Sequence, residues 1–185
     1  MLPVTAGTDR CINPVAAHAL SGMANDDEYQ RWVLTVPAEI TTDTIWRTPA
    51  YRLSLFAMSC AQVDAQLIAA NRRTRALLDQ LLRAVGSISA NLEEGYSRSS
   101  GRERAHFYEY ALGSTRESRG WYYKCESALP EEVVPVRLAT LTRIIRILTV
   151  VIPRERDLPL LKPARRSVDG PGLIDRQDAR STGKQ

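Results

Sequence analysis

Residues 74–96, TRALLDQLLRAVGSISANLEEGY, carry the clearest helical pattern in this chain of 185 residues. Placed 100° apart, seven of their side chains fall within about 120° of one another. These are Leu78, Leu81, Leu82, Val85, Ile88, Leu92 and Tyr96. The stretch therefore predicts an amphipathic helix with one buried apolar face. Gly95, near its end, is expected to weaken the helix.

Helices are also predicted on both sides of this stretch. Upstream, Thr48 is a predicted N-cap with Pro49 at the first helical position, and the apolar pattern fades near Asn71. Downstream, Ser100 and Glu103 form a capping box in which each satisfies the other's free amide, and this third helix is bounded by Pro130. Its predicted buried face is Phe107, Ala111, Ser114, Ser118, Trp121, Tyr122 and Cys125.

A fourth helix is predicted from near Pro135 to Pro153. Its arginines, Arg137, Arg143 and Arg146, are expected to point away from the core. Its predicted apolar face is Leu138, Leu141, Ile144, Ile145, Leu148 and Val151. Four helices with short links predict an all-α protein, folded as an antiparallel up-and-down four-helix bundle over 44–156. Residues 1–43 are predicted to be loosely structured, and 157–185 to be a disordered tail.

Charge is distributed unevenly along the chain. Residues 1–44 hold two basic and six acidic residues, whereas 45–156 hold 17 and 11. Of the 25 basic residues, all but Lys124, Lys162 and Lys184 are Arg. Arginine suits phosphate recognition and ion pairs, but GC-rich codon usage also explains such a bias.

Arginines gather at the two junctions beside the second helix, and antiparallel topology would put these junctions at opposite ends of the bundle. Nucleic-acid contact and a solvated helix surface are both open interpretations. Three tyrosines, Tyr96, Tyr108 and Tyr110, would add stacking surfaces for bases. The candidate nucleic-acid contacts are Arg72, Arg73, Arg75, Arg83, Arg98, Arg102 and Arg104.

Motifs for catalysis are incomplete. Glu103 and His106 form an ExxH, but a di-iron bundle needs a second one, and the other histidine, His18, lies in the N-terminal segment. Glu93 and Glu94 are helix neighbours that point about 100° apart, so they cannot converge on one atom. No phosphate-binding glycine motif is present. The sequence predicts a non-enzymatic protein without catalytic residues, cofactor or metal.

Cysteine usage and hydropathy bear on the compartment. Cys11, Cys60 and Cys125 show no CxxC spacing, and Cys60 and Cys125 lie on apolar stripes. This favours a reducing, cytoplasmic setting. The most apolar run, 144–152, is short and contains Arg146, so no membrane association is predicted.

The polar side of the second helix has its own periodicity. Ser87, Asn91 and Glu94 follow at i, i+4 and i+7 among small residues. A solvated face and tight packing against another helix or subunit both account for this pattern.

The segment 81–124 resembles a family of four-helix bundles named after proteins encoded in 23S rRNA intervening sequences, and the resemblance extends over about 45–156. Its two motifs are S-x-x-x-N-x-x-E-G and G-S-x-x-E. They correspond here to Ser87, Asn91, Glu94 and Gly95, and to Gly113, Ser114 and Glu117. The resemblance marks these residues as expected helix or subunit packing positions.

The resemblance implies a homo-oligomeric ring, usually a pentamer, without established enzymatic activity. A related group, the accessory variability proteins of diversity-generating retroelements, forms basic pentamers that engage RNA and a reverse transcriptase. The expected function is therefore a binding or scaffold module, with RNA as the candidate ligand. The alternative is an accessory protein that docks a protein partner, such as a reverse transcriptase, without touching nucleic acid.

Overall fold

The computed structural model describes residues 26–157, and these residues contain helices and no strand, which confirms the all-α class. A helix covers residues 26–33. The elements that follow are α2 (Ala38–Thr41), η1 (Thr44–Arg47), α3 (Pro49–Ala70), η2 (Arg75–Leu77), α4 (Leu78–Tyr96), α5 (Gly101–Lys124), η3 (Glu126–Ala128) and α6 (Val133–Asp157).

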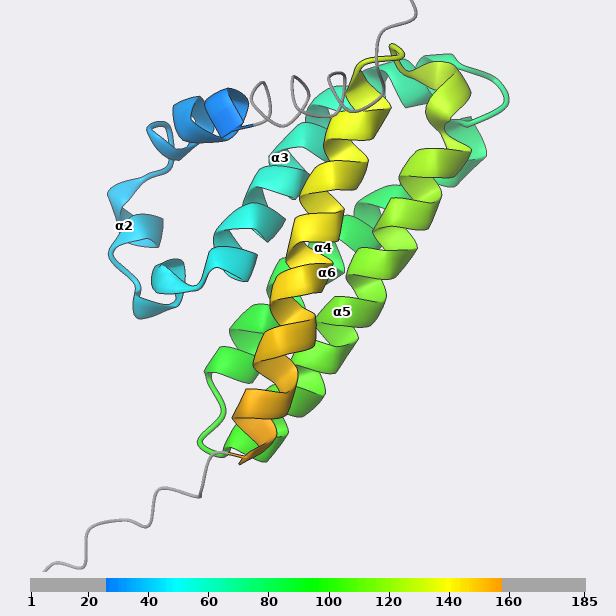
Figure 1. Cartoon of the computed structure of the whole chain (residues 1–185). Coiled ribbons are helices and arrows are strands. Elements are labelled where there is room, and N and C mark those ends of the chain that lie inside the picture. The colour runs from blue at the N-terminus through cyan, green and yellow to red at the C-terminus, as the bar shows by residue number, and fades with distance from the viewer. Residues whose placement is uncertain (1–25, 158–185) are drawn as a thin grey trace, which may run out of the picture.

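Four long helices lie side by side, and the N-terminal helices lie beside α3 (Figure 1). Helix α4 packs against α3 and α5, and α6 packs against α5 and α3. Their apolar faces meet in one core, where Phe56, Leu81, Ile88, Tyr122 and Ile144 are fully buried. Each long helix therefore covers the apolar stripe of two others.

The predicted helix at 74–96 is present, but its first turn is the 3₁₀ element η2. Leu81, Val85, Ile88 and Leu92 are buried as predicted. Tyr96 is instead 39% exposed, because it is the last residue of α4 and the loop to α5 begins directly after it.

Helix α5 begins at the predicted capping box. Ser100 Oγ accepts a hydrogen bond from the Glu103 amide at 3.2 Å. The Glu103 carboxylate accepts from the Ser100 hydroxyl at 2.8 Å, where the reciprocal bond was expected from the amide. The buried face of α5 is rotated about the helix axis relative to the predicted one. Phe107, Ser114 and Trp121, which were predicted to be buried, are only half-buried. The buried residues are Gly101, Ala105, Tyr108, Ala111, Thr115, Ser118 and Tyr122.

Helix α6 is longer than predicted. It begins at Val133 and continues through Pro153 to Asp157. Proline removes one helical hydrogen bond, here the one to the carbonyl of Thr149. Because Thr149 is exposed, water can solvate that carbonyl, and the helix does not end.

The N-terminal segment is more ordered than the sequence indicated. Residues 26–33 and α2 are helical, and rings of Tyr29 and Trp32 pack on Phe56 of α3. The prediction of a loose segment is therefore wrong for 26–43. Residues 1–25 and 158–185, including nearly all of the predicted disordered tail, lie outside the described range.

Helix α3 is long and apolar enough, by length and composition, to cross a membrane. Its best 18-residue window has a mean hydropathy of 1.3, and 44% of that window is buried inside the protein. Since core helices pass the same test, this property carries no conclusion about membranes.

Candidate functional site

The polar residues of the two packing motifs form hydrogen bonds inside their own helices. Asn91 Nδ2 donates to the Ser87 carbonyl at 2.7 Å, and Ser87 Oγ donates to the Arg83 carbonyl at 2.8 Å. On α5, the Ser114 carbonyl accepts from Ser118 Oγ at 2.7 Å. These bonds do not join helices, so the polar residues of the motif do not lock α4 to α5.

The motif glutamates also bind locally. Glu94 pairs with Arg98, four residues later in the loop that follows α4. Glu117 Oε1 accepts a hydrogen bond from Trp121 Nε1 at 3.1 Å. By contrast Glu93, next to Glu94, accepts from Tyr51 Oη of α3 at 2.9 Å. The neighbouring carboxylates Glu93 and Glu94 thus take different partners.

The two motif glycines differ in their surroundings. Gly95 is buried, and a Cβ there would lie 2.8 Å from Tyr108 Cε1. Gly113 is exposed, and a Cβ there would meet nothing within 4 Å. Gly95 is therefore the motif residue that brings α4 and α5 into close contact.

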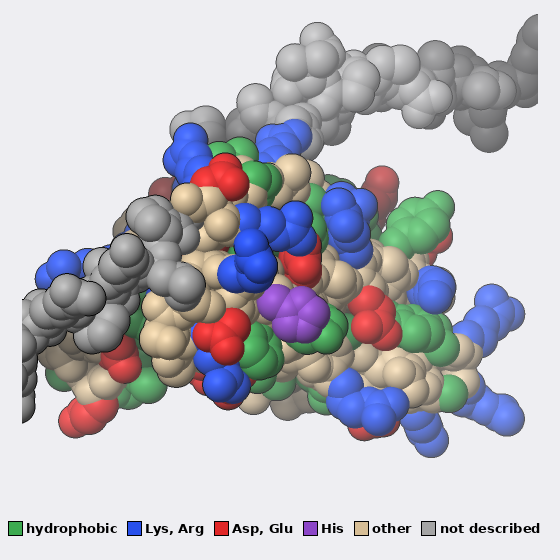
Figure 2. Space-filling model, turned by 90° about the horizontal axis from the view of Figure 1, so that it is seen from below, with side chains coloured by type: hydrophobic (Ala, Val, Ile, Leu, Met, Phe, Trp, Pro, Cys, Tyr) green, Lys and Arg blue, Asp and Glu red, His purple; other side chains and the backbone are tan. Residues whose placement is uncertain are grey.

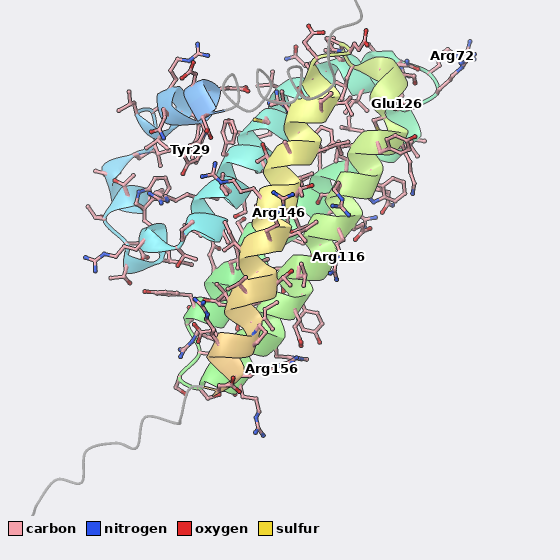
Figure 3. All side chains as sticks on the ribbon, viewed as in Figure 1. Tyr29, Arg72, Arg116, Glu126, Arg146 and Arg156 are labelled. Atoms are coloured by element: carbon pink, nitrogen blue, oxygen red, sulfur yellow. The ribbon has the colours of Figure 1, made fainter. Side chains whose placement is uncertain are left out.

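The two junctions with candidate arginines lie at opposite ends of the long helices. Figure 3 labels Arg72 at one end and, at the other, Arg156, which lines the same cleft as Arg98 and Arg102. Arg72, Arg73 and Arg75 follow α3 and are exposed. Arg75 Nε donates to the Ala69 carbonyl at 2.8 Å. The two junctions therefore do not form a single patch in one protomer.

Three of the other four candidate arginines, Arg83, Arg98 and Arg104, are paired with acids. Arg83 lies 3.4 Å from Asp79, and Arg104 Nε lies 2.8 Å from Glu155 of α6. Arg98 is paired with Glu94, so Arg102 is the member of this group without a carboxylate partner among residues 26–157.

A cleft of about 470 Å³ opens at the end of the bundle where α5 begins and α6 ends. Both basic and acidic side chains lie around the histidine on this end of the molecule (Figure 2). The guanidinium of Arg98 lies 4.9 Å from the Phe107 ring centroid, and His106 lies 4.7 Å from the Tyr110 ring. The lining residues are Arg98, Arg102, Glu103, His106, Phe107, Glu109 and Arg156. Aromatic surfaces and guanidiniums thus meet in one cleft, whereas Tyr108, predicted to stack bases, is buried.

Basic charge is concentrated on α5 and α6. Helix α5 carries five basic and three acidic side chains and α6 five and two, whereas α4 carries one and three. Four of these arginines, Arg102, Arg116, Arg146 and Arg154, are exposed and have no carboxylate partner within residues 26–157. We call the first three of these side chains the basic face (Arg116 and Arg146 are labelled in Figure 3).

Arg137 corrects the expectation that it points outward. It is 9% exposed, and its Nε lies 2.9 Å from Oδ2 of Asp64, which is 3% exposed. Tyr122 Oη donates to the same carboxylate oxygen at 3.0 Å, and Glu28 pairs with Arg137 Nη1 at 3.1 Å. Burial lowers the pKa of Arg137, but the hydrogen bond that its guanidinium donates to Asp64, together with the negative charges around it, outweighs burial and raises the pKa above its ordinary value. This network joins α3, α5, α6 and the N-terminal helix.

Burial suppresses the acidity of three groups in the core. It raises the pKa of Cys60 to about 12 and that of Tyr108 to about 12. The pKa of Tyr51 also rises to about 12, through burial and then its bond to Glu93. Cys60 and Cys125 are both free, buried thiols.

These shifts predict a loss of stability in alkali. The unfolded chain releases its thiol protons near pH 8.5 and its phenol protons near pH 10, in round figures, whereas the folded chain retains them to higher pH. Since the unfolded state then binds fewer protons, the free energy of unfolding should fall as pH rises from about 9 to 12. Urea denaturation at several pH values measures this slope, and Cys60→Ala should reduce it. A slope unchanged in that variant would contradict the role given to Cys60.

The ExxH pair, Glu103 and His106, belongs to no metal-binding group among residues 26–157. Within residues 26–157, no three His, Cys, Asp or Glu side chains are grouped to hold a metal ion. Glu103 of the ExxH binds Ser100, and His106 is exposed, 3.9 Å from Glu109.

The chain was also compared with known proteins. The family model described as 23S rRNA-intervening sequence protein matches residues 54–150, just over half of the chain. No curated protein and no solved structure matches it. The matched range contains the packing motifs, Asp64 and Arg137, while the N-terminal helix lies outside it. The chain belongs to the 23S rRNA-intervening sequence protein family.

Proposed function

We propose that this protein is a non-enzymatic, homo-oligomeric binding or scaffold module of the cytoplasm, with RNA as its ligand. In this proposal the four long helices are an antiparallel up-and-down bundle, and the protomers form a ring, with five as the expected number. The observation that carries the RNA part is the basic face of α5 and α6.

Unpaired guanidiniums are what a phosphate backbone requires. An arginine already bound to a carboxylate must break that bond before it can bind phosphate, whereas Arg102, Arg116 and Arg146 are free to do so. The cleft beside Arg102 adds the exposed ring of His106 and the half-buried ring of Phe107. Stacking on such rings and contact with phosphates together describe recognition of single-stranded nucleic acid.

Neutralising the basic face is expected to weaken RNA binding. Arg102→Gln, Arg116→Gln and Arg146→Gln should each lower the affinity for a single-stranded oligoribonucleotide about threefold at 0.1 M salt, because each removes about one phosphate contact. Fluorescence anisotropy across a salt series measures both the affinity and the salt slope, which should flatten in each variant.

Arg83→Gln is the matched control, since it removes the same charge from α4, where Asp79 already neutralises it. Equal losses in Arg83→Gln and the three face variants would indicate net charge alone. Failure of the unmodified protein to bind the oligonucleotide at low salt would overturn the RNA function.

The open glycines support the oligomeric part of the proposal. Gly86, Gly113 and Gly120 lie inside helices, where glycine costs about 1 kcal/mol relative to alanine. A Cβ at any of them would meet nothing within 4 Å in the protomer. Close approach by another subunit would account for them. A monomeric mass in solution at micromolar concentration would contradict this.

One observation favours the alternative, in which the module docks a protein instead of RNA. Val63 is 69% exposed and Leu67 is 48% exposed, one turn apart on α3. Such a pair suits an apolar contact between proteins. Val63→Gln with Leu67→Gln should abolish capture of a docked protein while leaving RNA affinity unchanged, if both sites exist.

A further inference from the structure

The helix at residues 26–33 is anchored to the bundle by aromatic rings. The Tyr29 and Trp32 ring centroids lie 5.4 and 5.5 Å from that of Phe56 on α3. Trp32 also lies 6.2 Å from Trp46 (Tyr29 is labelled in Figure 3). These contacts hold the helix against α3 and alongside α6.

Its acidic side chains reach arginines of α6. Asp26 Oδ1 lies 3.1 Å from Nη1 of Arg143, and Glu28 pairs with the buried Arg137. Arg143 lies three residues before Arg146 of the basic face, so the two share one side of α6. Without Asp26, Arg143 would extend the basic face by one turn of helix.

The two ion pairs differ in strength. The side chains of Arg143 and Asp26 are 55% and 64% exposed, whereas that of Arg137 is 10% exposed. An ion pair as exposed as Asp26–Arg143 contributes about 0–1 kcal/mol and is screened by salt. A polyanion can therefore displace Asp26 from Arg143 at little cost.

We propose that Asp26 competes with the phosphate backbone of RNA for Arg143, so that the acidic N-terminal helix partly covers the nucleic-acid surface of α6. The inference rests on the proposed RNA function. The covering helix lies outside residues 54–150, whereas Arg143 and Arg146 lie within them. The family's matched region thus carries the surface, and the preceding segment of this chain limits access to it.

Asp26→Asn tests the competition with Asp27→Asn as its control. Both substitutions raise the net charge by one at neighbouring positions, but Asp27 is exposed and its side chain makes no ion pair within residues 26–157. At low salt, Asp26→Asn should bind a single-stranded oligoribonucleotide about threefold more tightly than Asp27→Asn, in line with the weak pair it removes. The gain should disappear when Arg143→Gln is added.

The possible results separate the two claims. If the unmodified protein binds RNA and the two Asn variants bind it equally well, the competition is overturned and the RNA function is retained. A gain that persists with Arg143→Gln also overturns it. Absence of binding by all of these proteins overturns the RNA function and the competition together.

Discussion

Replacing Arg137 by Ala is expected to lower the free energy of unfolding by about 3 to 5 kcal/mol. The substitution leaves the carboxylate of Asp64, which is 3% exposed, in the core without its charged partner. Tyr122 would remain as a neutral donor at 3.0 Å, and one hydroxyl cannot replace two bonds from a guanidinium. Urea denaturation followed by circular dichroism measures the loss.

Arg143→Ala is the matched control for this substitution. Arg143 lies on the same helix and also pairs with an acid of the N-terminal helix, but its side chain is 55% exposed. Its loss should cost less than about 1 kcal/mol. The double variant Asp64→Leu, Arg137→Met should be more stable than Arg137→Ala, because no buried charge is left unpaired. Equal costs for Arg137→Ala and Arg143→Ala would contradict the buried network.

Asp64 and Arg137 show what the sequence predicts and what it does not. Periodicity correctly predicts the helices that contain them, but the prediction that the charged side chain of Arg137 points outward is wrong. Arg137 is in phase with Leu141, Ile144 and Leu148, which are all buried, and that phase indicated a buried position. The identity of its partner was not predictable, because Asp64 lies 73 residues earlier in the chain.

Tertiary contacts account for the other differences. The helix that includes residues 26–33 is held by rings on Phe56 and Trp46, and no local sequence pattern reveals these contacts. The predicted buried face of α5 is wrong in part, because small residues such as Ala105, Ser114 and Ser118 occur on several sides of this helix. They leave no clear apolar stripe in the sequence. Likewise, which arginines are free to bind phosphate depends on the acidic side chains near them in space. For this reason the candidates predicted from the sequence include Arg83, which pairs with Asp79, and do not include Arg146.

Gly95→Ala is expected to lower the free energy of unfolding by about 1 to 3 kcal/mol, through overpacking between α4 and α5. The new Cβ would lie 2.8 and 2.9 Å from Cε1 and Cδ1 of Tyr108 and 3.0 Å from Cβ of Phe107. Tyr108 is 4% exposed, and the Cβ of Phe107 is fixed to the backbone of α5, so the ring and the helix must both shift to admit the methyl group. This strain should outweigh the gain of about 1 kcal/mol that alanine brings to a helix.

Gly86→Ala on the same helix isolates the strain from the helix propensity. A Cβ at residue 86 meets nothing within 4 Å, so this variant should be more stable than the unmodified protein by about 0.5 to 1 kcal/mol. The sign of the change should therefore differ between two identical substitutions on α4.

In a background of Tyr108→Leu, which removes the ring, Gly95→Ala should cost less, and a double-mutant cycle measures that coupling. If Gly95→Ala stabilised the protein as Gly86→Ala does, Gly95 would have no packing role within the protomer. A destabilised Gly95→Ala with strong coupling to Tyr108 would instead identify this motif glycine as the point where α4 and α5 are held together.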